Sequence, residues 1–131
     1  MASIYKQIRL AVGGEQVWER LRDFYALHER LVPGFVVRCQ VEPGARSITF
    51  ENGLTVREAL VSIDDEWQRL SYTVVGGKAV HHHASAQVFP ESDGGCRLVW
   101  ITDVLPDELA VGIEKMMDRG CSVMKATLEA R

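Results

Sequence analysis

The feature that most constrains the fold is a series of short apolar segments, separated by sharp turns, that runs through the middle of the chain. The segments predicted as strands are 36–41, 47–50, 54–63, 70–75, 80–89 and 96–105. The turns between them contain Gly, Pro, Asn or Asp, and Asn52-Gly53 is a strong signal for a tight hairpin. Connections this short force neighbouring strands to run antiparallel. The sequence therefore predicts an antiparallel meander over this region.

A further strand and two helical segments flank this meander. Residues 3–12 alternate apolar and polar side chains, interrupted at Lys6, which is typical of a half-buried strand. Residues 15–31 carry apolar side chains at three- and four-residue spacings, which predicts a helical segment. Residues 107–130 have the longest helical pattern, with apolar side chains on one side and charged side chains on the other.

The sheet and the last helix each have an apolar face that must be buried against another element. A seven-stranded antiparallel sheet cannot bury one face by itself, and a long amphipathic helix must pack its apolar side against another element. A helix over residues 107–130, laid across the concave face of the sheet, satisfies both needs. A length of 131 residues is usual for one domain. We therefore predict a single α+β domain over residues 1–131, in which a curved seven-stranded antiparallel sheet wraps around the last helix and a short helical segment follows the first strand.

Charge and cysteine content bear on partners and location. The net charge is -3 and no basic run occurs, which argues against nucleic acid as a partner. No apolar stretch approaches the roughly 20 residues that span a bilayer, and the N-terminus lacks the pattern of a secretory signal. Cys39, Cys96 and Cys121 are widely spaced and form no CxxC pair, so reduced thiols in a cytoplasmic protein are expected.

The alternation of side chains along the strands predicts which polar residues face the last helix. In segment 80–89 the even positions are apolar except for His82, so His82 is expected to point inward. The same argument places Glu58 and Tyr72 inward, and the hairpin turns then line up a row across neighbouring strands. The predicted row is Glu58, Tyr72, His82 and Thr102. Arg46 joins Glu58 from its other side if the hairpin between them carries a bulge.

An inward carboxylate such as Glu58 must be paired or hydrogen-bonded, because an isolated buried charge is costly. Two interpretations stay open: a structural polar cluster within the sheet, and a functional group that anchors a ligand or transfers protons. Further ligand-lining residues are predicted on the inward face and on the last helix, with core packing as their alternative role. They are Arg46, Trp100, Thr102, Met116, Met117 and Gly120.

The run His81-His82-His83 does not predict a metal site. Neighbouring residues of a strand point to opposite faces, so only His81 and His83 could converge on one ion. The spacing puts no carboxylate or cysteine beside them, whereas zinc sites have clearer ligand spacing. We expect neither a metal nor a cofactor.

Several motifs, taken in order, resemble the START-like superfamily, also called SRPBCC, and within it the bacterial polyketide cyclase/dehydrase-like group. They are VWERLRDF at 17–24, PG at 33–34, VREAL at 56–60, RLSY at 69–72, GCRLVW at 95–100, and Gly120 followed by Met124-Lys125. The resemblance covers nearly the whole chain. It implies a helix-grip fold with a ligand cavity between the sheet and the C-terminal helix.

Because such a fold hosts ligand binders, cyclases and lipid carriers, three hypotheses stay open. The first is binding of a small hydrophobic or amphipathic ligand, polyketide-, aromatic- or lipid-like, in the cavity. The second is an enzyme of the polyketide cyclase/dehydratase type, with Glu58 and His82 as acid and base and Tyr72 as an orienting donor. The third is a protein-interaction module with a vestigial cavity. Assembly as a homodimer is also left open.

Overall fold

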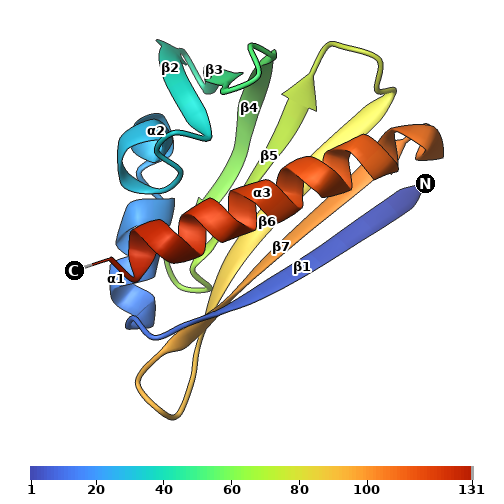
Figure 1. Ribbon diagram of the computed structural model, residues 1–131. Coiled ribbons are helices and arrows are strands. Elements are labelled where there is room, and N and C mark those ends of the chain that lie inside the picture. The colour runs from blue at the N-terminus through green and yellow to red at the C-terminus, as the bar shows by residue number, and fades with distance from the viewer. Residues whose placement is uncertain (131) are drawn as a thin grey trace.

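In the computed structural model, which describes residues 1–130, a single antiparallel sheet curves around a long C-terminal helix (Figure 1). The strands are β1 (Ala2–Leu10), β2 (Val36–Glu42), β3 (Ala45–Phe50), β4 (Thr55–Asp64), β5 (Arg69–Val75), β6 (His81–Pro90) and β7 (Cys96–Leu105). The helices are α1 (Gly14–Leu21), α2 (Leu27–Arg30) and α3 (Ala110–Leu128), and single 3-10 turns precede α2 (η1, Phe24–Ala26) and α3 (η2, Asp107–Leu109). The predicted α+β helix-grip fold is confirmed.

The strands lie in the order β1-β7-β6-β5-β4-β3-β2, and all neighbours are antiparallel. The meander from β2 to β7 follows the chain, and β1 returns to pair with β7 along its whole length. Figure 1 shows α3 lying across the concave face of the sheet, with α1 and α2 gathered at the end where α3 finishes. No helix within residues 1–130 combines the length and the apolar character needed to cross a membrane.

The helical segment predicted over 15–31 is not one continuous helix. The backbone leaves helical geometry at Asp23 (φ -77°, ψ 76°), between α1 and η1. Arg30 fixes the turn, because its guanidinium donates to the carboxylates of Glu19 (Nη2 to Oε1, 2.7 Å) and Asp23 (Nη1 to Oδ2, 2.8 Å). The interruption lets Phe24 turn into the core, where it is 4% exposed. Helical spacing alone gave no sign of this break.

Strand β4 contains a β-bulge between Leu60 and Ser62. Glu58 and Leu60 face α3 before the bulge, and Ile63 packs against the core after it, while Val61 is 57% exposed. A bulge adds one residue to one strand and so reverses which positions point inward. This explains why apolar side chains occur at both parities along β4, and it leaves the predicted inward direction of Glu58 intact.

Lys6 interrupts the apolar alternation of β1 because it pairs with the helix that covers the sheet. Its ammonium group lies 2.9 Å from the Glu114 carboxylate and 2.8 Å from that of Asp118. These two acidic residues are one helical turn apart on α3, so both can reach the same cation. The ion pairs fasten the solvent-facing side of α3 to β1.

Gly120 brings α3 close to the sheet. A Cβ atom added at this position would lie 3.1 Å from Cζ3 of Trp100 and 3.3 Å from Cε2 of Phe35. Such distances are shorter than ordinary van der Waals contact, so the indole of Trp100 packs directly on the helix backbone. Gly120 therefore leaves room for a sheet side chain, which agrees with the alternative role of core packing.

We expect the two glycines of α3 to respond differently to substitution by alanine. Gly112→Ala should raise the free energy of unfolding by up to about 1 kcal/mol, because alanine favours helix and nothing lies within 4 Å of the new Cβ. Gly120→Ala gains the same helix propensity but should lower stability, because the new Cβ must displace the Trp100 indole. Urea denaturation of both variants measures the difference, and equal stabilisation would contradict a tight contact at Gly120.

Candidate functional site

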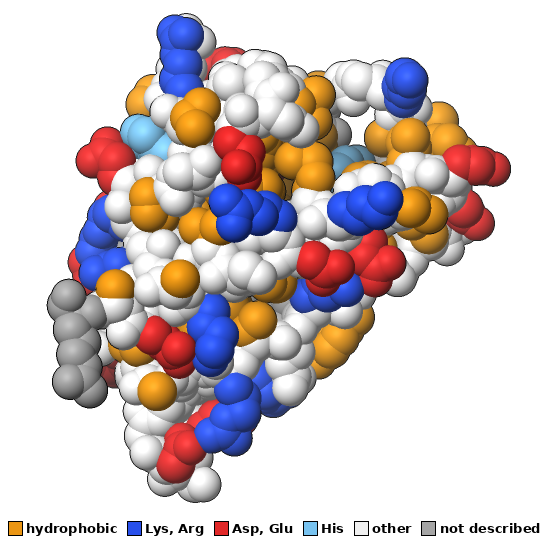
Figure 2. Space-filling view, viewed as in Figure 1, with side chains coloured by type: hydrophobic (Ala, Val, Ile, Leu, Met, Phe, Trp, Pro, Cys, Tyr) orange, Lys and Arg blue, Asp and Glu red, His pale blue; other side chains and the backbone are white. Residues whose placement is uncertain are grey.

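The concave face of the sheet and the first half of α3 enclose a cavity of about 380 Å³, which we call the outer cavity. Its wall is mostly apolar and includes Val56, Val74, Ile113, Met116 and Met117. The exposed loop 76–79 lines its mouth, and Figure 2 shows the opening above α3 as a hollow walled by apolar side chains. Its volume falls within the range of about 300–1,000 Å³ that small-molecule sites occupy.

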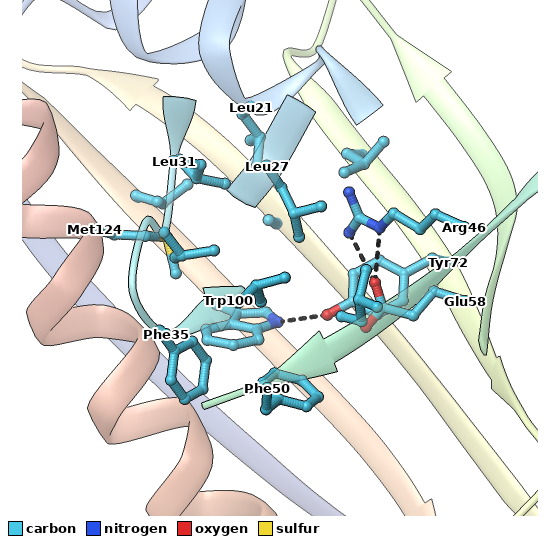
Figure 3. Close-up of a pocket in the computed structure, with 16 residues that line it drawn as sticks. Leu21, Leu27, Leu31, Phe35, Arg46, Phe50, Glu58, Tyr72, Trp100 and Met124 are labelled. Atoms are coloured by element: carbon cyan, nitrogen blue, oxygen red, sulfur yellow. Dashed lines mark hydrogen bonds and ion pairs between the residues drawn. The ribbon is translucent and has the colours of Figure 1, made fainter. Parts of the chain in front are cut away.

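A second space of about 70 Å³ lies deeper in the molecule, toward α1 and α2, and we call it the inner chamber (Figure 3). Most of its wall consists of buried aliphatic side chains. The two spaces share five lining residues, which form the wall between them. These are Phe35, Phe50, Glu58, Tyr72 and Trp100.

A buried ion pair is the polar centre of this wall. Arg46 on β3 and Glu58 on β4 lie directly opposite each other and are 4% and 5% exposed. Nε and Nη2 of Arg46 are each 2.8 Å from Oε1 of Glu58. The two residues pair as expected but without a bulge, because the hairpin closes with residues 51–53 as its loop and the amide of Phe50 donates to the carbonyl of Leu54.

Arg46 also joins the sheet to the helical region that follows β1. Its Nη1 donates to the backbone carbonyl of Phe24 at 2.7 Å, and its guanidinium lies 4.1 Å from the centroid of the Phe24 ring. A planar guanidinium with five N–H donors can make all these contacts at once, which a lysine could not. The hydrogen bonds compensate the desolvation of both charges, so the pair is stable only as a unit.

Tyr72 on β5 supplies a neutral donor beside the ion pair. Trp100 Nε1 donates to the Tyr72 hydroxyl oxygen at 3.2 Å. Burial raises the pKa of Tyr72 well above its usual value, and the charge of Glu58 raises it further, so the phenol keeps its proton at physiological pH. The O–H of Tyr72 has no acceptor among residues 1–130, so its proton is unused.

Glu58 offers the complementary group. Both contacts from Arg46 end on Oε1, and Oε2 makes no hydrogen bond with any residue that the structure describes. Figure 3 shows the carboxylate of Glu58 and the hydroxyl of Tyr72 pointing into the same space, beside the rings of Phe50 and Trp100. An acceptor next to a donor matches a hydroxyl group, which both donates and accepts.

His82 and Thr102 lie on the predicted inward face, but the register differs from the prediction by two residues. Tyr72 pairs with Ala84 instead of His82, and Ala84 in turn pairs with Thr102. Glu58 likewise lies diagonally from Tyr72 instead of opposite it. The hairpins after β5 and β6 turn one residue later than predicted, and after β4 a later turn and the bulge together give the same shift. A shift of two residues keeps the same face. The predicted row is therefore a diagonal series of neighbours.

The environment of His82 determines its charge. Burial lowers its pKa, and the neighbouring His81 lowers it further. His82 is therefore a neutral imidazole at physiological pH, with one nitrogen able to accept a proton. Together with Thr102 it lines the outer cavity. The expectation that neither a metal nor a cofactor is bound stays a prediction.

The remaining predicted residues divide between the two spaces. Those that line the outer cavity are Trp100, Thr102, Met116 and Met117, whereas Arg46 lines the inner chamber and Gly120 lies behind Trp100. Sequence reasoning missed Phe35 and Phe50, which line both spaces. Phe35 lies in the irregular segment before β2, where alternation predicts no direction. Phe50 shares the parity of Arg46 and Ile48 on β3, so alternation could have found it.

The sequence matches, over residues 1–129, the protein family described as polyketide cyclase / dehydrase and lipid transport. No curated protein matches the chain. Solved structures resemble it in fold at low sequence identity. An uncharacterised protein from Bacillus thuringiensis has a TM-score of 0.85 and 16% identity, with 97% of this chain and 98% of that chain covered.

Two further solved structures with the same fold belong to proteins of a named superfamily or activity. A START superfamily protein from Mycobacterium smegmatis has a TM-score of 0.73 and 14% identity, covering 98% of this chain and 95% of its own. Norcoclaurine synthase from Thalictrum flavum, in complex with dopamine and hydroxybenzaldehyde, has a TM-score of 0.70 and 16% identity, covering 99% and 88%. At these identities the likeness shows the fold alone.

We expect the buried ion pair to be sensitive to the loss of one partner. Arg46→Met should lower the free energy of unfolding by about 3–5 kcal/mol, because it leaves the Glu58 carboxylate buried and unpaired. The double variant Arg46→Met/Glu58→Gln removes both charges and should recover much of the loss. Urea denaturation tests both variants, and a double variant no more stable than the single one would contradict this account.

The lowered pKa of His82 predicts a pH dependence of stability. Below about pH 6.5, the usual histidine pKa, the unfolded chain binds a proton at this residue before the folded protein does. The free energy of unfolding should therefore decrease as the pH falls from neutral, and His82→Gln should lessen the decrease. Urea denaturation at a series of pH values measures the slopes, and parallel curves for the two proteins would argue against a desolvated His82.

Proposed function

Because the chain belongs to the polyketide cyclase / dehydrase and lipid transport family, we propose that the outer cavity binds a small, uncharged hydrophobic or amphipathic molecule. The family is START-like, and its fold is one that binds hydrophobic ligands. The observation that carries the proposal is the acceptor and donor pair of Glu58 and Tyr72 at the inner end of a mostly apolar cavity. A site of this kind takes affinity from apolar contact and orientation from a few polar groups.

The polar pair supports a hydroxyl group on the ligand. A ligand hydroxyl would donate to Oε2 of Glu58 and accept from the O–H of Tyr72, so both unused groups would be satisfied at once. Because Arg46 already balances the charge of Glu58, a neutral ligand group leaves no unpaired charge in the cavity. The ligand would therefore enter with its polar end first.

The rest of the cavity wall favours a ligand whose remaining part is apolar and either flat or flexible. The rings of Phe35, Phe50 and Trp100 stand next to the polar pair, and Met116 and Met117 lie on the α3 side. Methionine side chains adapt to ligands of different shapes. The same fold holds dopamine and hydroxybenzaldehyde in norcoclaurine synthase, which supports an aromatic ligand without identifying it.

Proton-transfer chemistry of the cyclase or dehydratase type is the second candidate function, because Glu58 and His82 both line the outer cavity. In this alternative, Tyr72 would donate to a substrate carbonyl, while neutral His82 and Glu58 would serve as the proton-transferring groups. The alternative requires substrate turnover that is lost in His82→Gln although binding is retained. An interaction module with a vestigial cavity agrees less well with an open cavity of about 380 Å³.

Tyr72→Phe tests the polar anchor. Naphthol and naphthalene, which differ only in the hydroxyl group, would be titrated into each protein by isothermal calorimetry. Wild type should bind naphthol more tightly than naphthalene, and Tyr72→Phe should weaken naphthol binding about fivefold, because one hydrogen bond is lost. Binding of naphthalene should change little.

Tyr25→Phe is the matched control, because the Tyr25 hydroxyl donates to the carbonyl of Glu42 (2.8 Å) outside both spaces. It should leave the affinities for both compounds unchanged. Equal naphthol affinities of wild type and Tyr72→Phe would contradict the proposal that the Tyr72 hydroxyl binds the ligand. Native mass spectrometry of the purified protein, together with a hydrophobic-ligand screen, tests the cavity more broadly, and no retained or added ligand in either would count against binding as the function.

A further inference from the structure

We propose that Trp100 limits how far a ligand can extend past its anchored hydroxyl group, by closing the outer cavity off from the inner chamber. We call this the length limit. The inference rests on the proposed function, because it assumes that a ligand occupies the outer cavity. It adds a role for a residue that touches neither charge of the site. Three observations carry it: the enclosure of the inner chamber, the fixed position of the indole, and the apolar character of the space behind it.

The wall of the inner chamber consists of buried side chains except for Phe50 and Trp100. Every other residue that lines it is 7% exposed or less, whereas these two have intermediate exposure. Both of them also line the outer cavity. The way from the outer cavity to the inner chamber therefore passes these two rings.

Trp100 is held on three sides, so its indole is a fixed wall. Its Nε1 donates to the Tyr72 hydroxyl, and its six-membered ring packs against the backbone at Gly120. On the sheet, its direct neighbour on β6 is Ala86, which is 7% exposed. Movement in one direction would break a hydrogen bond, and movement in another would collide with α3.

The space behind the indole suits an alkyl group. Its wall includes Leu21, Leu31, Val32, Ile48, Leu98 and Met124, and its polar side chains stand only on the side of the ion pair. Apolar cavities exclude water and accept apolar guests, and the part of the chamber away from the ion pair has this character. With about 70 Å³ of space, the chamber could hold a short alkyl arm if the indole were smaller.

The position of the ligand hydroxyl between Glu58 and Tyr72 determines which part of the ligand meets Trp100. A ligand hydroxyl held by Glu58 and Tyr72 is next to Trp100, because Tyr72 contacts both the ligand and the indole. A substituent that extends toward the mouth has room, whereas one that extends past the hydroxyl meets the ring. Wild type should therefore prefer ligands whose hydroxyl lies at the end of the molecule.

Positional isomers of nonanol test this limit, because they have the same formula and nearly the same hydrophobicity. In the primary alcohol the whole chain lies on one side of the hydroxyl, and in the central secondary alcohol an arm lies on each side. By isothermal calorimetry, wild type should bind the primary alcohol about tenfold more tightly than the central isomer. Trp100→Leu should abolish or reverse that preference, since one arm can then enter the inner chamber.

Two controls separate the chamber from general loosening of the protein. Trp67→Leu makes the same change at a tryptophan that is 65% exposed, and it should keep the wild-type preference. The double variant Trp100→Leu/Val32→Phe fills the inner chamber from its far wall, and it should restore the preference for the primary alcohol. If Trp100→Leu does not fold, Trp100→Phe makes a smaller opening and should shift the preference in the same direction.

The outcomes distinguish this inference from the proposed function. Equal binding of the two isomers by wild type, or an unchanged preference in a folded Trp100 variant, would overturn the length limit and leave ligand binding intact. A shift that persists when Val32→Phe fills the chamber would also overturn it. Failure of wild type to bind either nonanol or naphthol would instead overturn the proposed function, and the length limit with it.

Discussion

The buried pair of Arg46 and Glu58 governs how the rest of the molecule is arranged. Neither charge can be left alone in the interior, so β3 and β4 must keep the register in which the two residues face each other. Arg46 in addition needs the carbonyl of Phe24, which holds the broken helical region at one end of the sheet. The same pair leaves one carboxylate oxygen free beside Tyr72. Glu58 is therefore both required for the structure and a candidate group for binding a ligand.

The polar groups of the site offer hydrogen bonds without a net charge. Arg46 and Glu58 cancel each other, burial keeps Tyr72 in its protonated form, and burial keeps His82 neutral. A site of this kind distinguishes ligands by the pattern of their donors and acceptors and not by electrostatic attraction.

The inward face of the sheet could be predicted from sequence because it depends only on parity. Alternation placed Glu58, Tyr72 and His82 on the correct face, although the pairing of these residues across neighbouring strands is shifted by two residues. Exact pairing depends on the centre of each turn, and a glycine-rich segment such as 76–79 permits several centres. The bulge in β4 left one indirect sign in the sequence, apolar side chains at both parities, and a strand buried on both faces has the same pattern.

The inner chamber could not be predicted for a different reason. Its wall combines strand residues with Leu21, Val32 and other residues of a region whose helical spacing is broken at Asp23. The ion pair of Arg30 with Asp23 joins positions that no periodic pattern relates. Only the folded arrangement shows that this region closes one end of the sheet and leaves a space behind Trp100.

The pairing of β1 with β7 has a consequence for biosynthesis. The ribosome makes β1 before the other six strands and β7 after them, so the apolar side chains of Ile4 and Ile8 lack a partner strand while the intervening chain is made. The cover of the concave face, α3, emerges later still. Pairing between such distant segments slows folding and prolongs the exposure of unpaired strands. The sheet therefore cannot close on its β1 edge until β7 has left the ribosome, and until then the apolar face of β1 has neither its partner strand nor its covering helix.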